Sequence, residues 1–341
     1  MATQTHNDAP AAGAAGTVRQ RLWPLAATKF LTAFNDNAFK TVAMFVAMDI
    51  IAAQEIPEAA QEGQQAALVA FGSMVFMLPF VAFPTVCGWL ADRFPKRRIL
   101  IGAKCVEIGV MLLGLLAFVL VDRLGFIPLL ATVFLMSLQS AFFSPSFFGV
   151  LPETFDRTEL AGANGVVELI SFLGIILGAA CGALTKLIPG GYFAAPSAAV
   201  STCVGAPFVV VAVIGVLTAL RIRPTQATLS DQAFGWHVVT DYFRNFRYAF
   251  LTRPLALCII GNALFFSVGC LLQTSLLSFG KNILQVDNAQ TSLLNVAVAV
   301  GIGVGCHVAG KYSDKGIEFG LVPVGAVGMV VYFVNMLVLN E

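Results

Sequence analysis

Charge is scarce in this chain. Only 11% of its 341 residues are Asp, Glu, Lys or Arg, against about a quarter in an ordinary soluble domain, while 58% are hydrophobic. The mean hydropathy is +0.84. This composition excludes a soluble globular domain and predicts a polytopic helical membrane protein, for which we expect no nucleic-acid partner.

Cysteine and histidine are also sparse, and neither is arranged for chemistry. The seven cysteines are scattered without a C-x-x-C spacing, so we interpret them as small buried hydrophobic residues and expect neither disulfides nor a metal site. His237 is followed by Asp241, one residue too close for the H-x-x-x-x-D motif of acyltransferases. A phosphate-binding loop and a nucleophile elbow are missing from the sequence. We therefore expect no catalytic activity in this chain and no cofactor.

What the chain has instead is long apolar runs. Nine of them are long enough to cross a bilayer core about 30 Å thick, which takes roughly 20 helical residues. The sequence thus predicts an all-α fold. The expected spans are residues 25–51, 66–90, 99–121, 125–148, 163–187, 196–220, 254–279, 290–309 and 319–339.

The cations are distributed unequally between the two sides of these spans. With the N-terminus placed in the cytoplasm, 14 lysines and arginines fall in inner segments and 3 in outer ones. The first outer loop carries Glu55, Glu58 and Glu62 without a cation. The positive-inside rule then predicts a multi-pass inner-membrane protein with a cytoplasmic N-terminus. Residues 1–21 are expected to be a disordered cytoplasmic tail.

Polar residues interrupt the first apolar run near its middle, at Asn35, Asp36, Asn37 and Lys40. An ionised side chain at the bilayer centre costs about 2.5–3.5 kcal/mol, so we expect Asp36 and Lys40 to face protein or a wet cavity and to bind substrate or an ion. The alternative is an Asp36–Lys40 pair that neutralises itself. Lys29 shares their helix face, and we expect it to snorkel to the cytoplasmic surface.

Further polar groups fall in the third and fifth predicted spans. Lys104 and Glu107 lie three residues apart in one, and Asn164 and Glu168 lie four apart in the other. We count all of them as candidate substrate- or ion-binding residues. For Lys104 and Glu107 the alternative is a pair that neutralises itself. For Glu168 the alternative is a position at the membrane interface without a binding role.

The fifth predicted span also carries a ridge of glycines. Gly174, Gly178 and Gly182 recur at four-residue spacing, which is typical of a helix face that another helix approaches closely. We expect tight packing there without a gating role.

A turn motif is repeated after the second and eighth predicted spans. Residues 88–93 read GWLADR and residues 310–315 read GKYSDK, so both follow G-x-x-x-D-[RK]. These positions are equivalent in a transporter with duplicated six-helix halves. The chain resembles the major facilitator superfamily, although Pro95 stands where that family usually has glycine. The resemblance implies a gating motif at Gly88, Asp92, Arg93, Arg97, Gly310 and Asp314. The alternative for these residues is a purely topogenic role.

The resemblance also implies a domain plan. Residues 22–220 would form an N-terminal six-helix bundle, and residues 254–341 would form an incomplete, three-helix part of the C-terminal bundle. Between them, residues 221–253 would be a cytoplasmic linker with an amphipathic helix on the membrane surface. Because a superfamily member has two six-helix halves, we expect this chain to be a fragment of a longer protein.

Residues 34–40, 143–153 and 160–168 narrow the resemblance to the lysophospholipid transporter branch, some members of which are fused to an acyltransferase and an acyl-carrier-protein synthetase. The resemblance implies transport of lysophospholipid across the inner membrane for reacylation, with a possible coupling ion and a fused or separate acyltransferase partner. Asp36 would bind an ammonium group, and Lys40 or Lys104 a phosphate. Phe147 departs from the branch, which commonly has a lysine there.

Other functions remain open at this point. The same architecture would suit a carrier or exporter of another small amphipathic molecule, because a fold does not fix its substrate. A third alternative is a membrane anchor for an acyltransferase that transports nothing itself.

Overall fold

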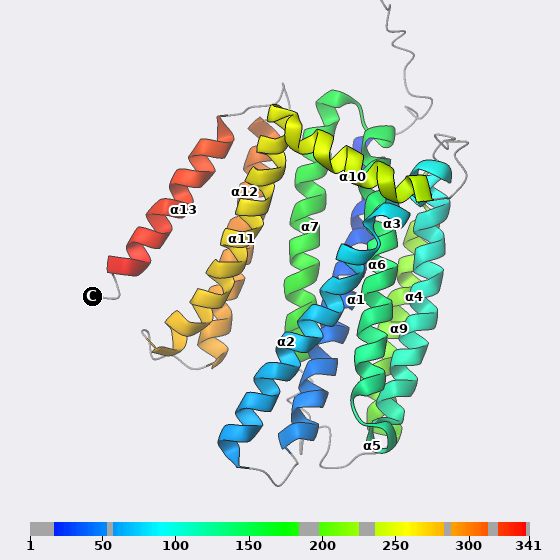
Figure 1. The fold of residues 1–341 in the computed structure, drawn as a ribbon, viewed down its shortest axis with the longest axis vertical. Coiled ribbons are helices and arrows are strands. Elements are labelled where there is room, and N and C mark those ends of the chain that lie inside the picture. Colours follow the sequence, from blue (N-terminus) through cyan, green and yellow to red (C-terminus); the bar gives the residue numbers. More distant parts are fainter. Residues whose placement is uncertain are drawn as a thin grey trace, which may run out of the picture. The chain divides into compact units, whose positions relative to one another are not determined.

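Every regular element in the described part of the chain is an α-helix (Figure 1). The computed structural model describes residues 17–52, 57–183, 198–224, 236–282, 288–312 and 320–338. These residues divide into two compact units, with the boundary between residues 232 and 233. That boundary lies within the stretch that we assigned to the linker, 221–253.

The first unit contains α1 (Val18–Ala52), α2 (Glu58–Ala82), α3 (Pro84–Arg93), α4 (Lys96–Val119), α5 (Val121–Leu124), α6 (Ile127–Thr154), α7 (Arg157–Ala183) and α9 (Ala198–Leu220). The second unit contains α10 (Trp236–Leu251), α11 (Arg253–Asn282), α12 (Asn288–Tyr312) and α13 (Leu321–Val338). Residues 18–21, which we assigned to the tail, belong to α1, whereas residues 1–16 lie outside the described ranges.

Each predicted span overlaps one of these helices, and the all-helical membrane fold is confirmed. Five described helices are long and apolar enough to cross a membrane, or six if the bent pair of α10 and α11 is one span. α1 is not among the five, because charged residues interrupt its apolar run. α12 and α13 supply shorter apolar stretches, Val300–Gly310 and Val322–Asn335.

The second predicted span, residues 66–90, is broken into α2 and α3. Pro84 occupies the first turn of α3, where its fixed φ suits a helix start and its missing N–H is not needed. The amide of Phe83 donates to the carbonyl of Pro79 and ends α2. The sequence prediction of one continuous helix was therefore wrong at this point.

In the second unit, α10 and α11 meet at a sharp bend. Residues 243–251 and 253–269 are inclined by 100° to each other. α10 coincides with the predicted amphipathic helix, and its aromatic side chains Phe243, Phe246 and Phe250 are exposed.

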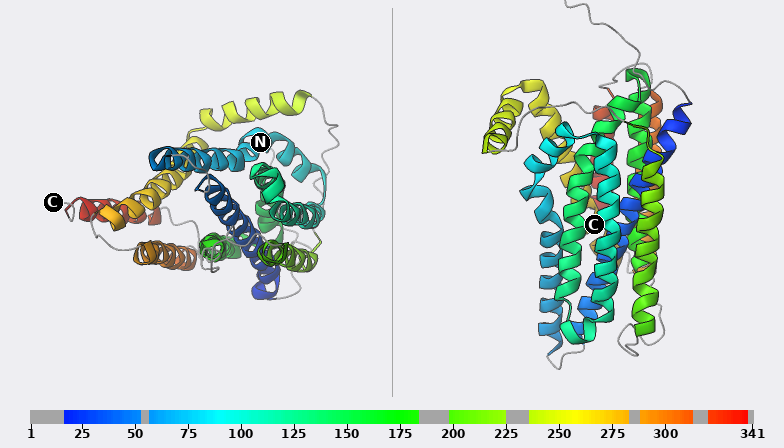
Figure 2. Two further views of the ribbon diagram at one scale, coloured as in Figure 1. Left: turned by 90° about the horizontal axis from the view of Figure 1, so that it is seen from below. Right: turned by 90° about the vertical axis from the view of Figure 1, so that its right-hand side faces the viewer.

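α1 occupies a central place among the helices of the first unit and contacts α2, α6, α7 and α9 (Figure 2). Its closest neighbour is α7. A methyl group added at Gly174 would lie 2.8 Å from the carbonyl oxygen of Phe30, and one at Gly182 would lie 2.9 Å from that of Ala38. The predicted glycine ridge is thus confirmed as a close packing surface, and its partner is α1.

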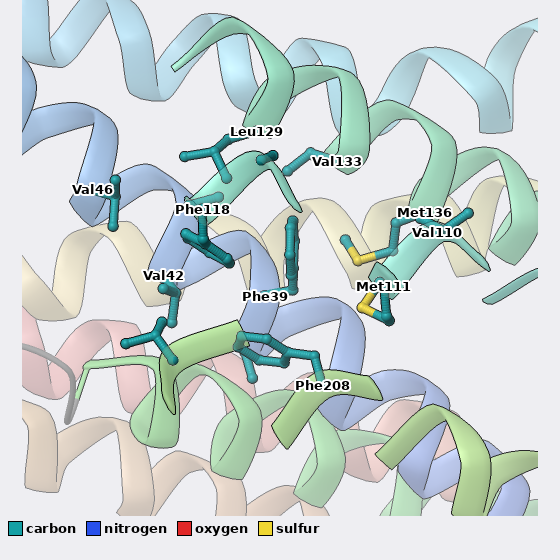
Figure 3. Close-up of a cluster of buried hydrophobic side chains, with 14 of the residues drawn as sticks. Phe39, Val42, Val46, Val110, Met111, Phe118, Leu129, Val133, Met136 and Phe208 are labelled. Carbon is teal, nitrogen blue, oxygen red and sulfur yellow. The ribbon is translucent and has the colours of Figure 1, made fainter. Parts of the chain in front are cut away.

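Aromatic side chains fill the core between α1, α4 and α9. The ring of Phe39 lies 5.5 Å from that of Phe118 and 5.3 Å from that of Phe208, and all three are buried (Figure 3). Such tilted and edge-on ring pairs contribute about 0.5–1.5 kcal/mol each beyond their burial. Phe39 lies between Asn37 and Lys40 on α1. This core therefore fixes the position of the polar residues along the axis of α1.

Candidate functional site

A buried network of polar side chains joins α1, α4 and α6. Its centre is Glu107, which accepts hydrogen bonds from Lys104 at 2.5 Å, from Asn35 at 2.9 Å and from Gln139 at 3.2 Å. Lys104, Glu107 and Asn35 have no solvent exposure at all. A buried ion pair is tolerated only when further hydrogen bonds satisfy it, as they do here.

This network bears on an alternative that the sequence left open. Lys104 and Glu107 form an ion pair with each other, and Glu107 already accepts hydrogen bonds at both of its carboxylate oxygens. The geometry favours a structural role for the pair, in which it holds Asn35 and Gln139 in place.

Asp36 lies beside this network and, unlike Glu107, has a carboxylate oxygen without a partner. Asn35 Oδ1 and Gln139 Oε1 are also buried and unpaired. The hydroxyl of Ser140 donates to Asp36 Oδ2 at 2.6 Å, while Asp36 Oδ1 is buried and has no hydrogen-bond partner. Leaving a buried acceptor unpaired costs about 1–3 kcal/mol, and more when it is charged. The free oxygen therefore marks a place where a donor or cation would be stabilised.

Lys40 lies one turn beyond Asp36 on α1, and Asn37 follows Asp36 directly; both are partly exposed. Lys40 Nζ lies 3.4 Å from Asn37 Oδ1 and 4.6 Å from the ring centre of Phe76 on α2. Among the described ion pairs none joins Asp36 to Lys40, so the self-neutralising pair considered from the sequence is not formed. Lys40 keeps donor capacity for a further acceptor.

Lys29 is the residue that sequence reasoning placed differently. Its Nζ lies 5.4 Å from the ring centre of Phe147 and 5.2 Å from that of Phe148, both on α6. It also interacts electrostatically with Asp36 and with Glu168 of α7. The side chain is thus packed against α6 near the candidate site and is not extended to the cytoplasmic surface as we expected.

The two candidates on α7 differ from each other. Glu168 is partly buried and within electrostatic range of Lys29, whereas Asn164 is exposed. The structure therefore brings Glu168 towards the polar residues of α1 and leaves Asn164 outside the network.

The first copy of the turn motif, residues 88–93, forms the end of α3, and arginines in and after it contact neighbouring groups. Arg97 donates to the carbonyl oxygens of Ile222 at 2.5 Å and Leu220 at 2.8 Å, and so caps the last turn of α9. The guanidinium of Arg93 lies 5.4 Å from the ring centre of Trp89, and Asp92 is exposed. Of the second copy, Gly310 lies in the last turn of α12, and Asp314 lies outside the described residues.

Two ion pairs at the same end of the first unit had no signal in the sequence. Arg21 of α1 lies 2.9 Å from each carboxylate oxygen of Glu159 on α7, and Lys96 of α4 pairs with Glu153 of α6. The first pair joins residues 138 positions apart, a separation that no periodicity can predict.

The chain matches the Major Facilitator Superfamily over residues 25–340, and it belongs to that family of membrane transporters. Several curated relatives are more specific. The lysophospholipid transporter LplT of Photorhabdus laumondii is 28% identical over 289 residues, which cover 84% of this chain and 64% of the relative. LplT of Enterobacter sp. strain 638 is 29% identical over 287 residues, with 83% and 64% covered. LplT of Citrobacter koseri is 29% identical over 289 residues. The chain thus matches about 64% of the length of these relatives.

Proposed function

We propose that the protein to which this chain belongs moves lysophospholipid across the inner membrane, so that the lipid can be reacylated on the cytoplasmic side. The relatives in the comparison are named as lysophospholipid transporters. The observation within the molecule that carries the proposal is the unpartnered Oδ1 of Asp36 on the same helix face as the cations Lys29 and Lys40.

The charges on this face match the headgroup of lysophosphatidylethanolamine. Such a headgroup carries an anionic phosphate and an ammonium group, and charge-assisted hydrogen bonds to either are roughly twice as strong as neutral ones. In the proposed complex Asp36 binds the ammonium group and Lys40 binds the phosphate. Lys104 is the weaker candidate for the phosphate, because Glu107 already neutralises it.

Lys29 supplies the cation that Phe147 does not. The resemblance to the lysophospholipid transporter branch implies that a lysine is common at the position of Phe147. Here Lys29 Nζ lies over the ring of Phe147, so the positive charge comes from α1 to the same part of α6. We extend the proposed site to Lys29, with Glu168 as a counter-charge that orients it.

We also propose that the N-terminus is cytoplasmic. The excess of lysine and arginine in the inner segments favours this orientation. Arg21, Lys96 and Arg97, whose contacts tie together the ends of α1, α4, α6, α7 and α9, would then lie on the cytoplasmic side.

The test is uptake of labelled lysophosphatidylethanolamine into spheroplasts that express the protein. We expect uptake above that of cells without it, and competition by unlabelled lysolipid. Absence of uptake would reject the substrate. Energy-dependent efflux of another amphiphile, insensitive to lysolipid, would instead support an exporter of the same superfamily. A scaffold for an acyltransferase would give reacylation in extracts but no uptake.

A further inference from the structure

An apolar groove of about 1090 Å³ lies between the end of α1, the first half of α2 and the first half of α6. Its lining includes Ile51 of α1, Leu68 and Phe71 of α2, and Leu130 of α6. Gln64 is its polar lining residue. Ligand pockets are typically about 300–1,000 Å³, so this groove has room for a substantial ligand.

The groove has a packed floor and an open rim. Ile51, Leu68 and Leu130 are 5–7% exposed and form one buried cluster, whereas Phe71 and Ile127 are 50% and 70% exposed. A floor fixed by close packing and a rim open along its length suit a long, narrow apolar ligand that enters from the side.

One end of the groove leads to the cation of the proposed site. Lys40 lies over the ring of Phe76, and the residue before Phe76, Val75, belongs to the lining of the groove. Met44, one turn beyond Lys40 on α1, packs against Gly72 close to Leu130. Met44 and Met48 pack against the buried cluster that contains Ile51, Leu68 and Leu130, so apolar side chains of α1 connect Lys40 with the floor of the groove.

The length of this path fits one leaflet of a membrane. Ile51 lies eleven residues after Lys40, which corresponds to roughly 16 Å along a helix. One leaflet occupies about half of a hydrocarbon core of about 30 Å, so an acyl chain covers about 15 Å. An amphiphile with its phosphate at Lys40 would have the end of its chain near Ile51.

We propose that this groove binds the single acyl chain of the lysophospholipid while Lys40 holds its phosphate. The inference rests on the proposed function and adds to it the place where the acyl chain of the lipid binds. With a cytoplasmic N-terminus, the groove lies in the outer-leaflet half of the first unit, because α1 runs from the inner side towards Ile51. In this pose the phosphate lies near the middle of the bilayer and the acyl chain extends through the outer-leaflet half, which is the reverse of the orientation of an outer-leaflet lipid.

The test is photolabelling of the reconstituted protein in phosphatidylcholine vesicles. The probe is lysophosphatidylethanolamine with a diazirine at the end of its acyl chain, and the labelled residues are mapped by mass spectrometry. We expect labels within 64–75 and 126–135, which excess unlabelled lysolipid removes. Labels spread over other lipid-facing residues, or labels that lysolipid does not compete away, would show that the groove holds only bulk lipid and overturn the inference.

A groove-filling variant gives a second, independent readout. Ala67 lies in the lining and is exposed, so Ala67→Trp fills the groove without disturbing its buried floor. We expect about tenfold weaker binding of the long-chain lysolipid, since displacing even two methylene groups has that effect. Binding of glycerophosphoethanolamine, which has no acyl chain, should not change. Leu116→Trp, on the exposed face of α4, is the matched control and should bind both ligands normally.

These results separate the inference from the proposed function. Competed labelling elsewhere, with normal uptake, would reject the groove and keep lysophospholipid as the substrate. Absence of competed labelling together with absence of uptake would reject both. An Ala67→Trp protein that binds the long-chain lysolipid as tightly as the wild type would reject the groove alone.

Discussion

Two groups of charged residues lie side by side in the first unit, and they differ in how far the protein itself pairs their charges. Around Glu107, every charge is enclosed and paired, and Lys104 has no exposure. On the neighbouring face of α1, Lys40 is partly exposed and Asp36 keeps a buried oxygen without a partner. The charges of the first group are paired with each other, whereas Asp36 in the second group has a buried carboxylate oxygen that accepts no hydrogen bond from the described residues.

The difference teaches that intramembrane charge is not by itself a sign of binding. Lys104 and Glu107 are as unusual in an apolar span as Asp36 and Lys40, and the sequence offers no way to rank them. Their partners make the distinction: a buried pair with additional hydrogen bonds contributes to the specificity of packing, and an incompletely paired carboxylate is available for recognition.

The largest expected effect is on the enclosed group. Glu107→Ala leaves Lys104 buried without a counter-charge, and such losses cost about 3–5 kcal/mol of stability. Thermal unfolding of the detergent-solubilised protein measures it. Glu153→Ala removes a carboxylate that is 30% exposed and pairs with Lys96, and it should cost less than Glu107→Ala.

A double variant sharpens the same comparison. Lys104→Met combined with Glu107→Leu removes both charges together, and we expect it to be more stable than Glu107→Ala. If the double variant unfolds as early as the single one, the pair is not the structural unit described here.

Asp36→Asn is expected to act on transport and not on stability. It keeps the shape and the contact with Ser140 but removes the charge, and hydrogen bonds to charged groups contribute about 1.5–3 kcal/mol. Lysolipid binding should weaken about 10- to 150-fold with an unchanged unfolding temperature. Asp122→Asn, at an exposed position of α5, is the control. Uptake at the wild-type level would remove Asp36 from the site.

A smaller effect is expected at Lys29. Lys29→Met removes the cation that lies over Phe147, and lysolipid binding should weaken less than in Asp36→Asn, because Lys29 is partly exposed to solvent. Adding Phe147→Lys returns the charge to the same part of α6 and should recover much of the loss. Competition binding measures both variants. A double variant as weak as Lys29→Met would contradict the exchange of the cation between α1 and α6.

The smallest expected effect is at Phe76. Phe76→Leu removes the ring that holds Lys40 in position. An exposed cation–π contact contributes about 0.5–1 kcal/mol, so the loss of positioning should weaken binding by at most about two- to fivefold. The concentration dependence of uptake measures this change. Phe80→Leu alters the next ring of α2 and leaves Lys40 with its partner. Equal effects of the two substitutions would assign the loss to packing.

Hydropathy predicted where the helices lie but not where they break. The interruption at Pro84 was missed, although the proline is plain in the sequence. Pro24 lies inside α1, and Pro145 and Pro152 lie inside α6, each without ending its helix. A proline in an apolar run therefore does not reveal by itself whether the helix bends, continues or restarts, because neighbouring groups can satisfy the freed carbonyls.

The candidate site was predicted in its composition but not in its pairing. The charge interruption of α1 pointed to Asp36 and Lys40 because burial of charge is costly in any membrane. The bond between Asn35 and Glu107 joins residues 72 positions apart, and that of Ser140 with Asp36 spans 104, so helix periodicity carries no information about them. Lys29 was misplaced because a lysine near a helix end can extend outwards or pack inwards with the same hydropathy.

The glycine contact between α1 and α7 has a mechanical consequence. Where two backbones touch at Gly174, Gly178 and Gly182, neither helix can slide along the other without a clash. Asp36 and Glu168 are attached to the two halves of this rigid pair and keep a constant spacing. The spacing between these two carboxylates is therefore held by contact of the two backbones and does not depend on the side-chain partners of either residue.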